Sequence, residues 1–203
     1  DGRRINISEP IDMRAVTGRS AFATRRHIHN GQFDVQTGAA WDTDVFTSQA
    51  TYSPGNGFKL TGVTNVANIP VGALLEGNGV GREVYVRGRN IAAQELSISK
   101  KLYDADGTQN FTFQKFKYLV DFSGFGLLSK FSMADIEFQC NNRCSGIMLA
   151  PSGATFHLRD CFVSRPMDRG ITSIGTGCQG IFVDRCQFLS PEEGELVPNR
   201  KTI

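Results

Sequence analysis

The chain has 203 residues, a formal net charge of +2 and 40% hydrophobic residues, which allows one domain with a small satellite. The near-neutral charge argues against a nucleic-acid-binding protein. No run of about 18 apolar residues and no basic-then-apolar leader occurs, so we expect neither a membrane span nor a signal peptide in this sequence.

The first candidate elements lie in residues 1–38, around the stretch RHIHNGQF at 26–33. Ile28 and Phe33 are apolar, and the pair Asn30-Gly31 between them is turn-prone. The spacing of these four residues matches that of a repeat found later in the chain. We therefore predict that residues 1–38 form the first coils of a repeating β structure.

Residues 39–113 have a different character. The turn clusters SPGNG and EGNGVG interrupt them, and two stretches alternate at period two: REVYVRGR, with Val84 and Val86, and QELSISKKL, with Leu96 and Ile98. We predict a small antiparallel β module inserted into or beside the repeating coils. The alternative is a run of irregular coils with long loops.

Residues 114–203 contain the clearest repeat. The stretches FSMADIEF, FHLRDCFV and IFVDRCQF begin at 131, 156 and 181, a spacing of 25 residues each time. Their apolar columns sit two apart, break at one polar column and then resume, which indicates two short strands separated by a bend. The columns are Phe131/Phe156/Ile181, Met133/Leu158/Val183, Asp135/Asp160/Arg185, Ile136/Cys161/Cys186 and Phe138/Val163/Phe188. Glycine-led segments at 146–149 and 170–174 supply a third strand.

Three short strands in each 25-residue unit predict an all-β solenoid, in which each coil stacks on the last and inward residues form ladders. Adjacent rungs of such a stack lie about 4.8 Å apart. Chance similarity, or sandwich strands at regular spacing, is the alternative, but sandwich strands rarely repeat a bend residue in register.

If the apolar columns face inward, their neighbours face solvent. The outward residues His157, Arg159, Phe162, Phe182 and Asp184 combine aromatic faces with hydrogen-bonding groups. A sugar needs both kinds of contact, so we treat them as candidate substrate-binding residues. The alternative is that these residues form contacts between subunits.

The bend column places Asp135 and Asp160 one rung apart. Their carboxylates could then lie about 5 Å from each other, the separation found in a retaining glycosidase, and one of them could serve as an acid catalyst. Two other interpretations stay open. Aspartate at a β bend commonly bonds the local backbone, and Arg159 and Arg185 could neutralise the pair.

Five cysteines show no metal-binding spacing, and no cofactor motif is present, so we expect neither a metal nor a cofactor. Cys161 and Cys186 share an inward column, where thiols behave as small apolar residues. A disulfide between them is geometrically possible at one-rung separation, but nothing in the sequence requires it.

Two stretches carry a resemblance to known families. The rungs HLRDCFV and FVDRCQFLS resemble the coil motif of the pectate-lyase-like superfamily of right-handed parallel β-helices, over about 128–190 and more loosely over 1–35. The stretch LTGVTNVANIPVGALLEGNGVGREVYVRGR, followed by ELSISKKLYDADGTQNFTF, is similar to a β module of phage tail fibres and tailspikes. Together they resemble tailspike proteins of phages or phage-like particles, which bind and often cleave surface polysaccharide.

The resemblance implies a virion appendage that recognises bacterial surface polysaccharide outside the cell, as a homotrimer attached to other tail proteins. The alternative is a polysaccharide depolymerase, either a glycoside hydrolase or a lyase, or a secreted pectinolytic enzyme. The N-T-D, D-D and G-H-G motifs of polygalacturonases are absent from the sequence, as is an acidic calcium-binding cluster like that of pectate lyases. The fold alone therefore supplies no catalytic site.

Because the sequence lacks an initiator Met and ends at NRKTI without a polar cap, we expect the parent protein to continue on the C-terminal side.

Overall fold

The chain divides into two compact units, Asp1–Asp42 with Lys117–Ile203, and Thr43–Phe116. We call them the solenoid unit and the inserted unit. The computed structural model describes residues 3–13, 25–103, 105–123, 129–149, 154–174 and 180–189, so the NRKTI end lies outside the described residues. Each unit has its own cluster of buried apolar side chains.

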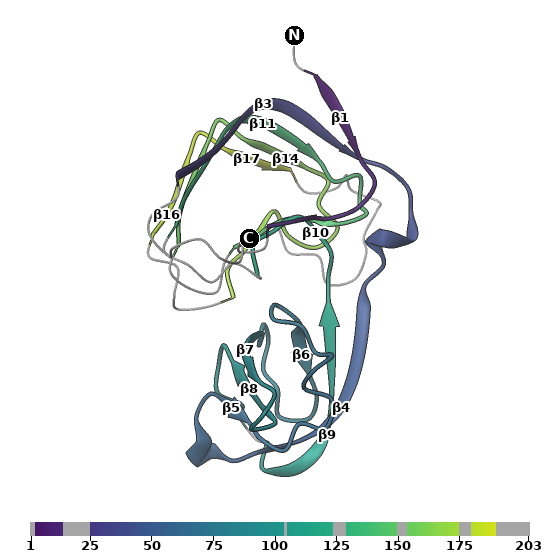
Figure 1. Cartoon of the computed structure of the whole chain (residues 1–203), viewed down its shortest axis with the longest axis vertical. Helices are drawn as coiled ribbons and strands as arrows, with labels where there is room; N and C mark the ends of the chain where they lie inside the picture. The colour runs from purple at the N-terminus through teal and green to yellow at the C-terminus, as the bar shows by residue number, and fades with distance from the viewer. Residues whose placement is uncertain are drawn as a thin grey trace. The chain divides into compact units, whose positions relative to one another are not determined.

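The solenoid unit is built on a seven-stranded sheet, which we call the long sheet (Figure 1). All of its strand pairs are parallel. Its order is β1-β3-β11-β13-β16, and β14 pairs with β11 and β17. Its strands are β1 (Arg4–Ile7), β3 (Arg25–Val35), β11 (Ser129–Gln139), β13 (Ala154–Arg159), β14 (Phe162–Ser164), β16 (Gly180–Asp184) and β17 (Gln187–Leu189).

A second parallel sheet, the short sheet, has the order β15-β12-β10-β2. Its strands are β2 (Ile11–Asp12), β10 (Tyr118–Asp121), β12 (Ser145–Met148) and β15 (Ile171–Thr172). Successive coils contribute to both sheets, since β11 leads to β12 and β13 with β14 leads to β15. The β-solenoid with coils of about 25 residues is therefore confirmed, as is the third strand predicted in the glycine-led segments.

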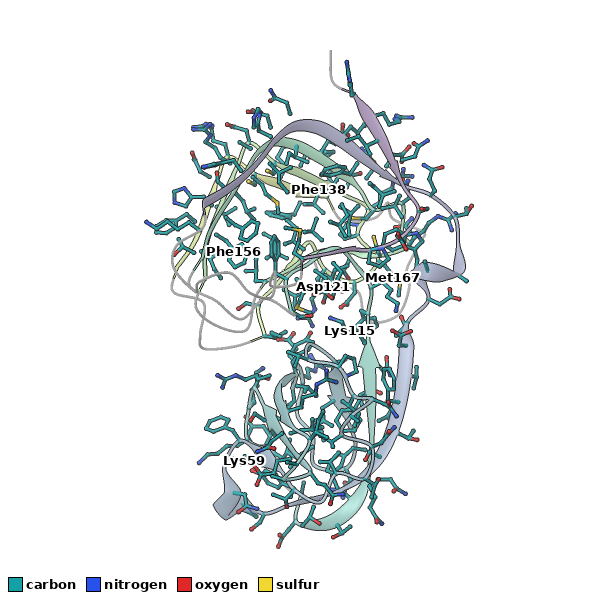
Figure 2. All side chains as sticks on the ribbon, in the orientation of Figure 1. Lys59, Lys115, Asp121, Phe138, Phe156 and Met167 are labelled. Carbon is teal, nitrogen blue, oxygen red and sulfur yellow. The ribbon has the colours of Figure 1, made fainter. Side chains whose placement is uncertain are left out.

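The inward ladders follow the predicted columns. Phe131 pairs with Phe156, and Phe156 pairs with Ile181. The first two rings are stacked, with centroids 5.9 Å apart, and both side chains are buried. Figure 2 shows Phe138 and Phe156 inside the coil. Ile181 is 42% exposed, and β16, on which it lies, is the last strand in the described order of the long sheet, next to β13.

The described part of the range predicted as an early coil stacks on the later repeats. Ile28 pairs with Met133, and Phe33 pairs with Phe138 in the same register as the later repeats. In these two rungs the two predicted short strands are one, because β3 and β11 each continue through the bend residue. In the following coils the bend separates β13 from β14 and β16 from β17.

The inserted unit contains two three-stranded antiparallel sheets, with orders β4-β9-β6 and β5-β8-β7. The predicted strand residues Val84, Val86, Leu96 and Ile98 are all fully buried. The predicted alternation holds at Leu96 and Ile98, with exposed Ser97 between them, but not at Val84 and Val86, because Tyr85 is buried as well. Its strands are β4 (Asp44–Tyr52), β5 (Lys59–Leu60), β6 (Leu74–Glu76), β7 (Val86–Asn90), β8 (Glu95–Ile98) and β9 (Gly107–Lys115). The two short 3-10 helices are η1 (Ala39–Trp41) in the solenoid unit and η2 (Pro54–Asn56) in the inserted unit. No helix among the described residues is long and apolar enough to span a membrane.

Candidate functional site

The bend column organises the outward face of the long sheet. Asn30, Asp135, Asp160 and Arg185 occupy it in four successive rungs, and all four have positive φ, at 58°, 56°, 52° and 50°. Asparagine and aspartate tolerate this left-handed region better than other residues with a side chain, which explains three of the four choices. Turning the backbone at the same place in every rung stacks the neighbouring outward side chains into columns.

Two hollows flank this column. The histidine hollow, of about 610 Å³, is lined by His27, Ile28, His29, Asn30, Ser132, Ala134, Asp135, His157 and Arg159. The acidic hollow, of about 700 Å³, is lined by Asn30, Gly31, Gln32, Asp135, Ile136, Glu137, Asp160 and Phe162. Asn30 and Asp135 line both hollows, so the two form one continuous surface across the bend.

Two arginines, Arg185 and Arg159, contact the Asp160 carboxylate. Arg185 donates from Nε to Oδ1 at 2.6 Å and from Nη2 to Oδ2 at 2.8 Å, and Arg159 Nε lies 3.5 Å from Oδ2. The hydrogen bonds from Arg185 hold the pKa of the Asp160 carboxyl below its ordinary value. A general acid needs the opposite shift, so this environment favours a structural carboxylate that is ionised at neutral pH.

The Asp135 carboxylate has different surroundings from that of Asp160, although both residues have the same backbone conformation. It is exposed, and no hydrogen bond or ion pair to its carboxylate is found within the described part of the chain. Asp135 and Asp160 both line the acidic hollow on adjacent rungs, as predicted from the repeat. Their role in catalysis stays a prediction.

The structure distributes the predicted substrate-binding residues over three places. His157 and Arg159 line the histidine hollow, and Phe162 lines the acidic hollow. Phe182 and Asp184 lie on β16, one rung further. The Phe182 ring contacts His157 edge-on, with centroids 4.5 Å apart and an interplanar angle of 69°.

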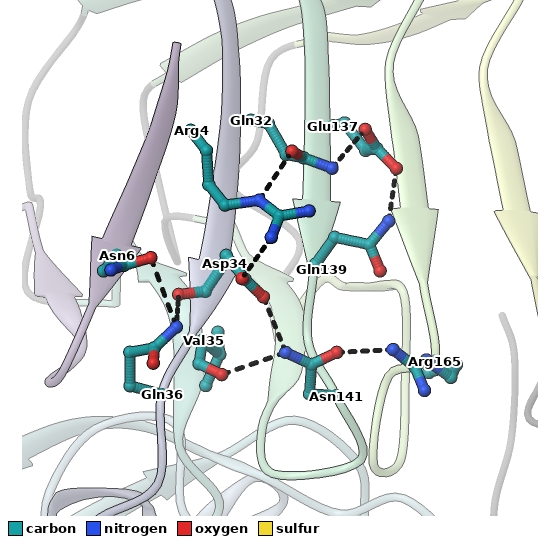
Figure 3. Close-up of polar contacts among 10 residues, drawn as sticks. All are labelled: Arg4, Asn6, Gln32, Asp34, Val35, Gln36, Glu137, Gln139, Asn141 and Arg165. Carbon is teal, nitrogen blue, oxygen red and sulfur yellow. Dashed lines mark hydrogen bonds and ion pairs between the residues drawn. The ribbon is translucent and has the colours of Figure 1, made fainter.

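Sequence reasoning missed a polar network that extends from the acidic hollow (Figure 3). Gln32 Nε2 donates to Glu137 Oε2 at 2.7 Å and Gln32 Oε1 accepts from Arg4 Nε at 3.1 Å, while Gln139 Nε2 donates to the other oxygen of Glu137. These bonds fix the orientation of Gln32 and Glu137 at the hollow. The sequence did place Glu137 and Phe162 in one outward column. It did not show that Gln32 lies beside Glu137, because that depends on which coil stacks on which.

A second part of the network lies on the same face. Asn141 donates from Nδ2 to Asp34 Oδ1 at 2.8 Å and to the Val35 carbonyl at 2.9 Å, and its Oδ1 accepts from Arg165 at 2.7 Å. Asn141 and Arg165 both have positive φ, at 52° and 46°. These contacts link three successive coils at the C-terminal ends of β3, β11 and β14.

The described cysteines, Cys140, Cys144, Cys161 and Cys186, are free thiols. Burial raises the pKa of the Cys161 thiol to about 11, and burial together with the neighbouring Cys140 raises the pKa of Cys144 well above its ordinary value. Both thiols are therefore un-ionised at neutral pH and are poor nucleophiles. The described residues contain no group of three or more His, Cys, Asp or Glu side chains that could hold a metal ion.

The hollows and the polar network are thus the main features of the site, and its function must be argued from them. Comparison with protein-family models, with curated proteins and with solved structures finds no match to this chain.

Proposed function

We propose that the protein recognises bacterial surface polysaccharide through the outward face of the long sheet. The observation that supports this most directly is the pair of adjoining hollows that share Asn30 and Asp135. Amide, carboxylate, imidazole and guanidinium groups converge there with the ring of Phe162. Sugar hydroxyls need hydrogen-bonding partners of this kind, and the apolar faces of sugar rings need an aromatic contact.

The scaffold beneath the hollows favours binding. On β11 and β13 the outward residues alternate with inward ones that are buried, among them Phe131 and Phe156. Strand pairing and the Gln32–Glu137 hydrogen bond fix the surface before any ligand arrives. A preorganised site loses less conformational entropy on binding than a flexible one, which raises affinity.

Binding is better supported than cleavage. Arg185 donates a hydrogen bond to each oxygen of Asp160 and lowers the pKa of this carboxyl, so Asp160 is unsuited to be the general acid, and neither oxygen is free to act as the nucleophile. Asp135 remains available as a hydrogen-bond acceptor for a sugar hydroxyl. We therefore assign Asp135 to recognition.

The biological setting that we propose is a tailspike or tail-fibre-like appendage of a virion or phage-like particle, outside the cell, with the chain in a homotrimer and attached to other tail proteins. The support is the sequence resemblance together with the β-solenoid fold. Phe182 is 55% exposed and is not among the residues that line the hollows. We therefore assign Phe182 to the contact between subunits and Phe162 to the glycan.

The test is binding of the intact chain to purified capsular polysaccharides and lipopolysaccharide O-chains, measured by biolayer interferometry. We expect Phe162→Ala and Asp135→Asn to weaken binding by at least about tenfold, since each removes a direct contact. Asn is well tolerated at positive φ, so Asp135→Asn keeps the bend. Tyr103→Ala, which removes an 80% exposed ring from the inserted unit, is the matched control and should have no effect.

The polymer is then followed by size-exclusion chromatography after incubation. We expect its chain length to stay constant. If the polymer is shortened by the unsubstituted chain but not by Asp135→Asn, the protein is a depolymerase instead. If the unsubstituted chain binds no polymer, the proposal is overturned.

A further inference from the structure

The chain contains three histidines, and all of them line one hollow. His27 and His29 lie two residues apart on β3 and therefore on the same face, and His157 comes from β13. Ser132 of β11 separates His27 from His157 in the rung between them. All three histidine side chains are exposed.

Arg159 adds a permanent cation to this hollow. Because Arg185 bonds both oxygens of Asp160, at 2.6 and 2.8 Å, Arg159 makes a longer contact of 3.5 Å through Nε. Within the described residues, no hydrogen bond donated by its terminal nitrogens is found, and its side chain is 59% exposed. A guanidinium in this state can bind a carboxylate, sulfate or phosphate with two parallel hydrogen bonds.

The other charged groups on this face set the net charge that an anion would meet in the hollow. Asp135 lines it and carries a negative charge that offsets Arg159. Asp184 pairs with Arg185 at 3.2 Å, Asp160 pairs with the same guanidinium, and Lys130 is exposed on β11. Within its lining the hollow therefore holds one cation, Arg159, and one carboxylate, Asp135, and each of the three imidazoles adds a ring N–H that can donate a hydrogen bond to an anion.

The geometry points to an acidic polysaccharide as the ligand, with the anionic group of one sugar in the histidine hollow and an uncharged, hydroxyl-bearing sugar in the acidic hollow. This inference rests on the proposed function and adds the substrate class to it. Asp135, Glu137 and Asp160 would repel an anion from the acidic hollow.

The experiment compares uronate-bearing and neutral capsular polysaccharides, with each acidic polymer also tested after reduction of its carboxylates to alcohols. We expect the acidic polymers to bind and the reduced forms to bind at least about tenfold more weakly, because charge-assisted hydrogen bonds are lost. Arg159→Gln should weaken binding of the native polymer by a similar factor and leave the reduced polymer unaffected. Arg82→Gln removes the same charge from an exposed position of the inserted unit and should change neither.

Two further arms identify the anion and the role of histidine. Affinity that survives carboxyl reduction but is lost on desulfation or dephosphorylation assigns the site to a sulfate or phosphate substituent. The combined variant H27Q/H29Q/H157Q should bind the native polymer more weakly than the unsubstituted chain, because all three imidazoles line the hollow that holds the anion. Melting curves of every variant are recorded first, and His157→Gln alone serves if the combined variant is unstable.

Equal affinity for native polymers and for their reduced, desulfated and dephosphorylated forms would overturn the inference, as would binding confined to neutral polymers. Either result leaves the proposed function intact. If the unsubstituted chain binds none of the polymers, the proposed function is overturned together with this inference.

Discussion

The solenoid unit and the inserted unit are both all-β, but they are specified in different ways. In the solenoid unit, a residue packs against the residue one coil away, so Phe131, Phe156 and Ile181 form a column that can be recognised in the sequence. In the inserted unit, antiparallel strands such as β4 and β9 pair in opposite directions, and no constant spacing relates the partners. Stacked coils therefore leave a periodic record in the sequence, whereas antiparallel pairing leaves only local alternation and turn residues.

The largest effect that tests this comparison is expected from truncating the inward column. Phe156→Ala should lower the free energy of unfolding by about 3–5 kcal/mol, because a fully buried ring between two aromatic neighbours leaves a cavity. His157→Ala, one residue away but exposed, should stay within about 0.5 kcal/mol. Urea unfolding of the two variants measures the difference, and equal losses would contradict the assignment of inward and outward faces.

A similar loss is expected in the inserted unit, but confined to it. Phe113 is fully buried in the separate core of that unit, so Phe113→Ala should cost about 3–5 kcal/mol there. Amide hydrogen exchange read by mass spectrometry should rise in peptides from 43–116, while Phe156→Ala should raise it in peptides from 129–149. Faster exchange in both units with either variant would show that the two cores unfold together.

A smaller effect is expected where two coils approach most closely. A Cβ added at Gly146 would lie 2.2 Å from the carbonyl oxygen of Gly170, a backbone atom in the next rung. Gly146→Ala should therefore force the coils apart and cost about 1–3 kcal/mol or more. Gly31→Ala is the control, because its Cβ would meet the nearest atom at 4.0 Å. It should change stability by less than about 1 kcal/mol, in the stabilising direction. Thermal melts compare the two, and an unaffected Gly146→Ala would mean that the rungs can separate freely.

The smallest effect concerns the pH dependence of the Arg185–Asp160 pair. The folded-state pKa of Asp160 is lowered, so the pair contributes stability above the unfolded-state pKa of about 3.9, and this contribution is lost as the pH falls through the lower folded value. Arg185→Gln should be slightly less stable than the parent at pH 7, and the difference should narrow near pH 3. Melting temperatures of both proteins across this range measure it. A difference independent of pH would show that Arg185 stabilises the coil by packing alone.

Much of the solenoid could be predicted because alternation and the bend recur every 25 residues. The columns through Asp135, Asp160 and Arg185 also indicated that arginine could neutralise a carboxylate, and Arg185 does so for Asp160. The different state of Asp135 follows from its place in the stack, since Arg185 is two rungs away from it.

The candidate site could be predicted only in part. Three of the eight residues that line the acidic hollow and four of the nine that line the histidine hollow come from β3. The partner strand β11 is far along the chain: Gln32 and Glu137 are separated by 105 residues. The inserted unit interrupts the period between them, so the sequence gives no spacing that brings His27 and His29 beside His157. The same interruption hides the network around Arg4 and Asn141, which depends on which coil is stacked on which.

The place where the inserted unit joins the solenoid has a consequence for protein engineering. In later coils the corner between the long and short sheets is a brief turn, as between Gln139 and Ser145. At the equivalent corner after Val35, the chain leaves for the inserted unit and returns before Tyr118 through paired neighbours, Asp44 and Lys115. With its two ends held together, an entire folded unit occupies the position of a turn at little extra entropic cost. This corner is therefore a natural graft point, where a different cargo domain with adjacent termini can be exchanged for residues 43–116 without altering the register of the coils.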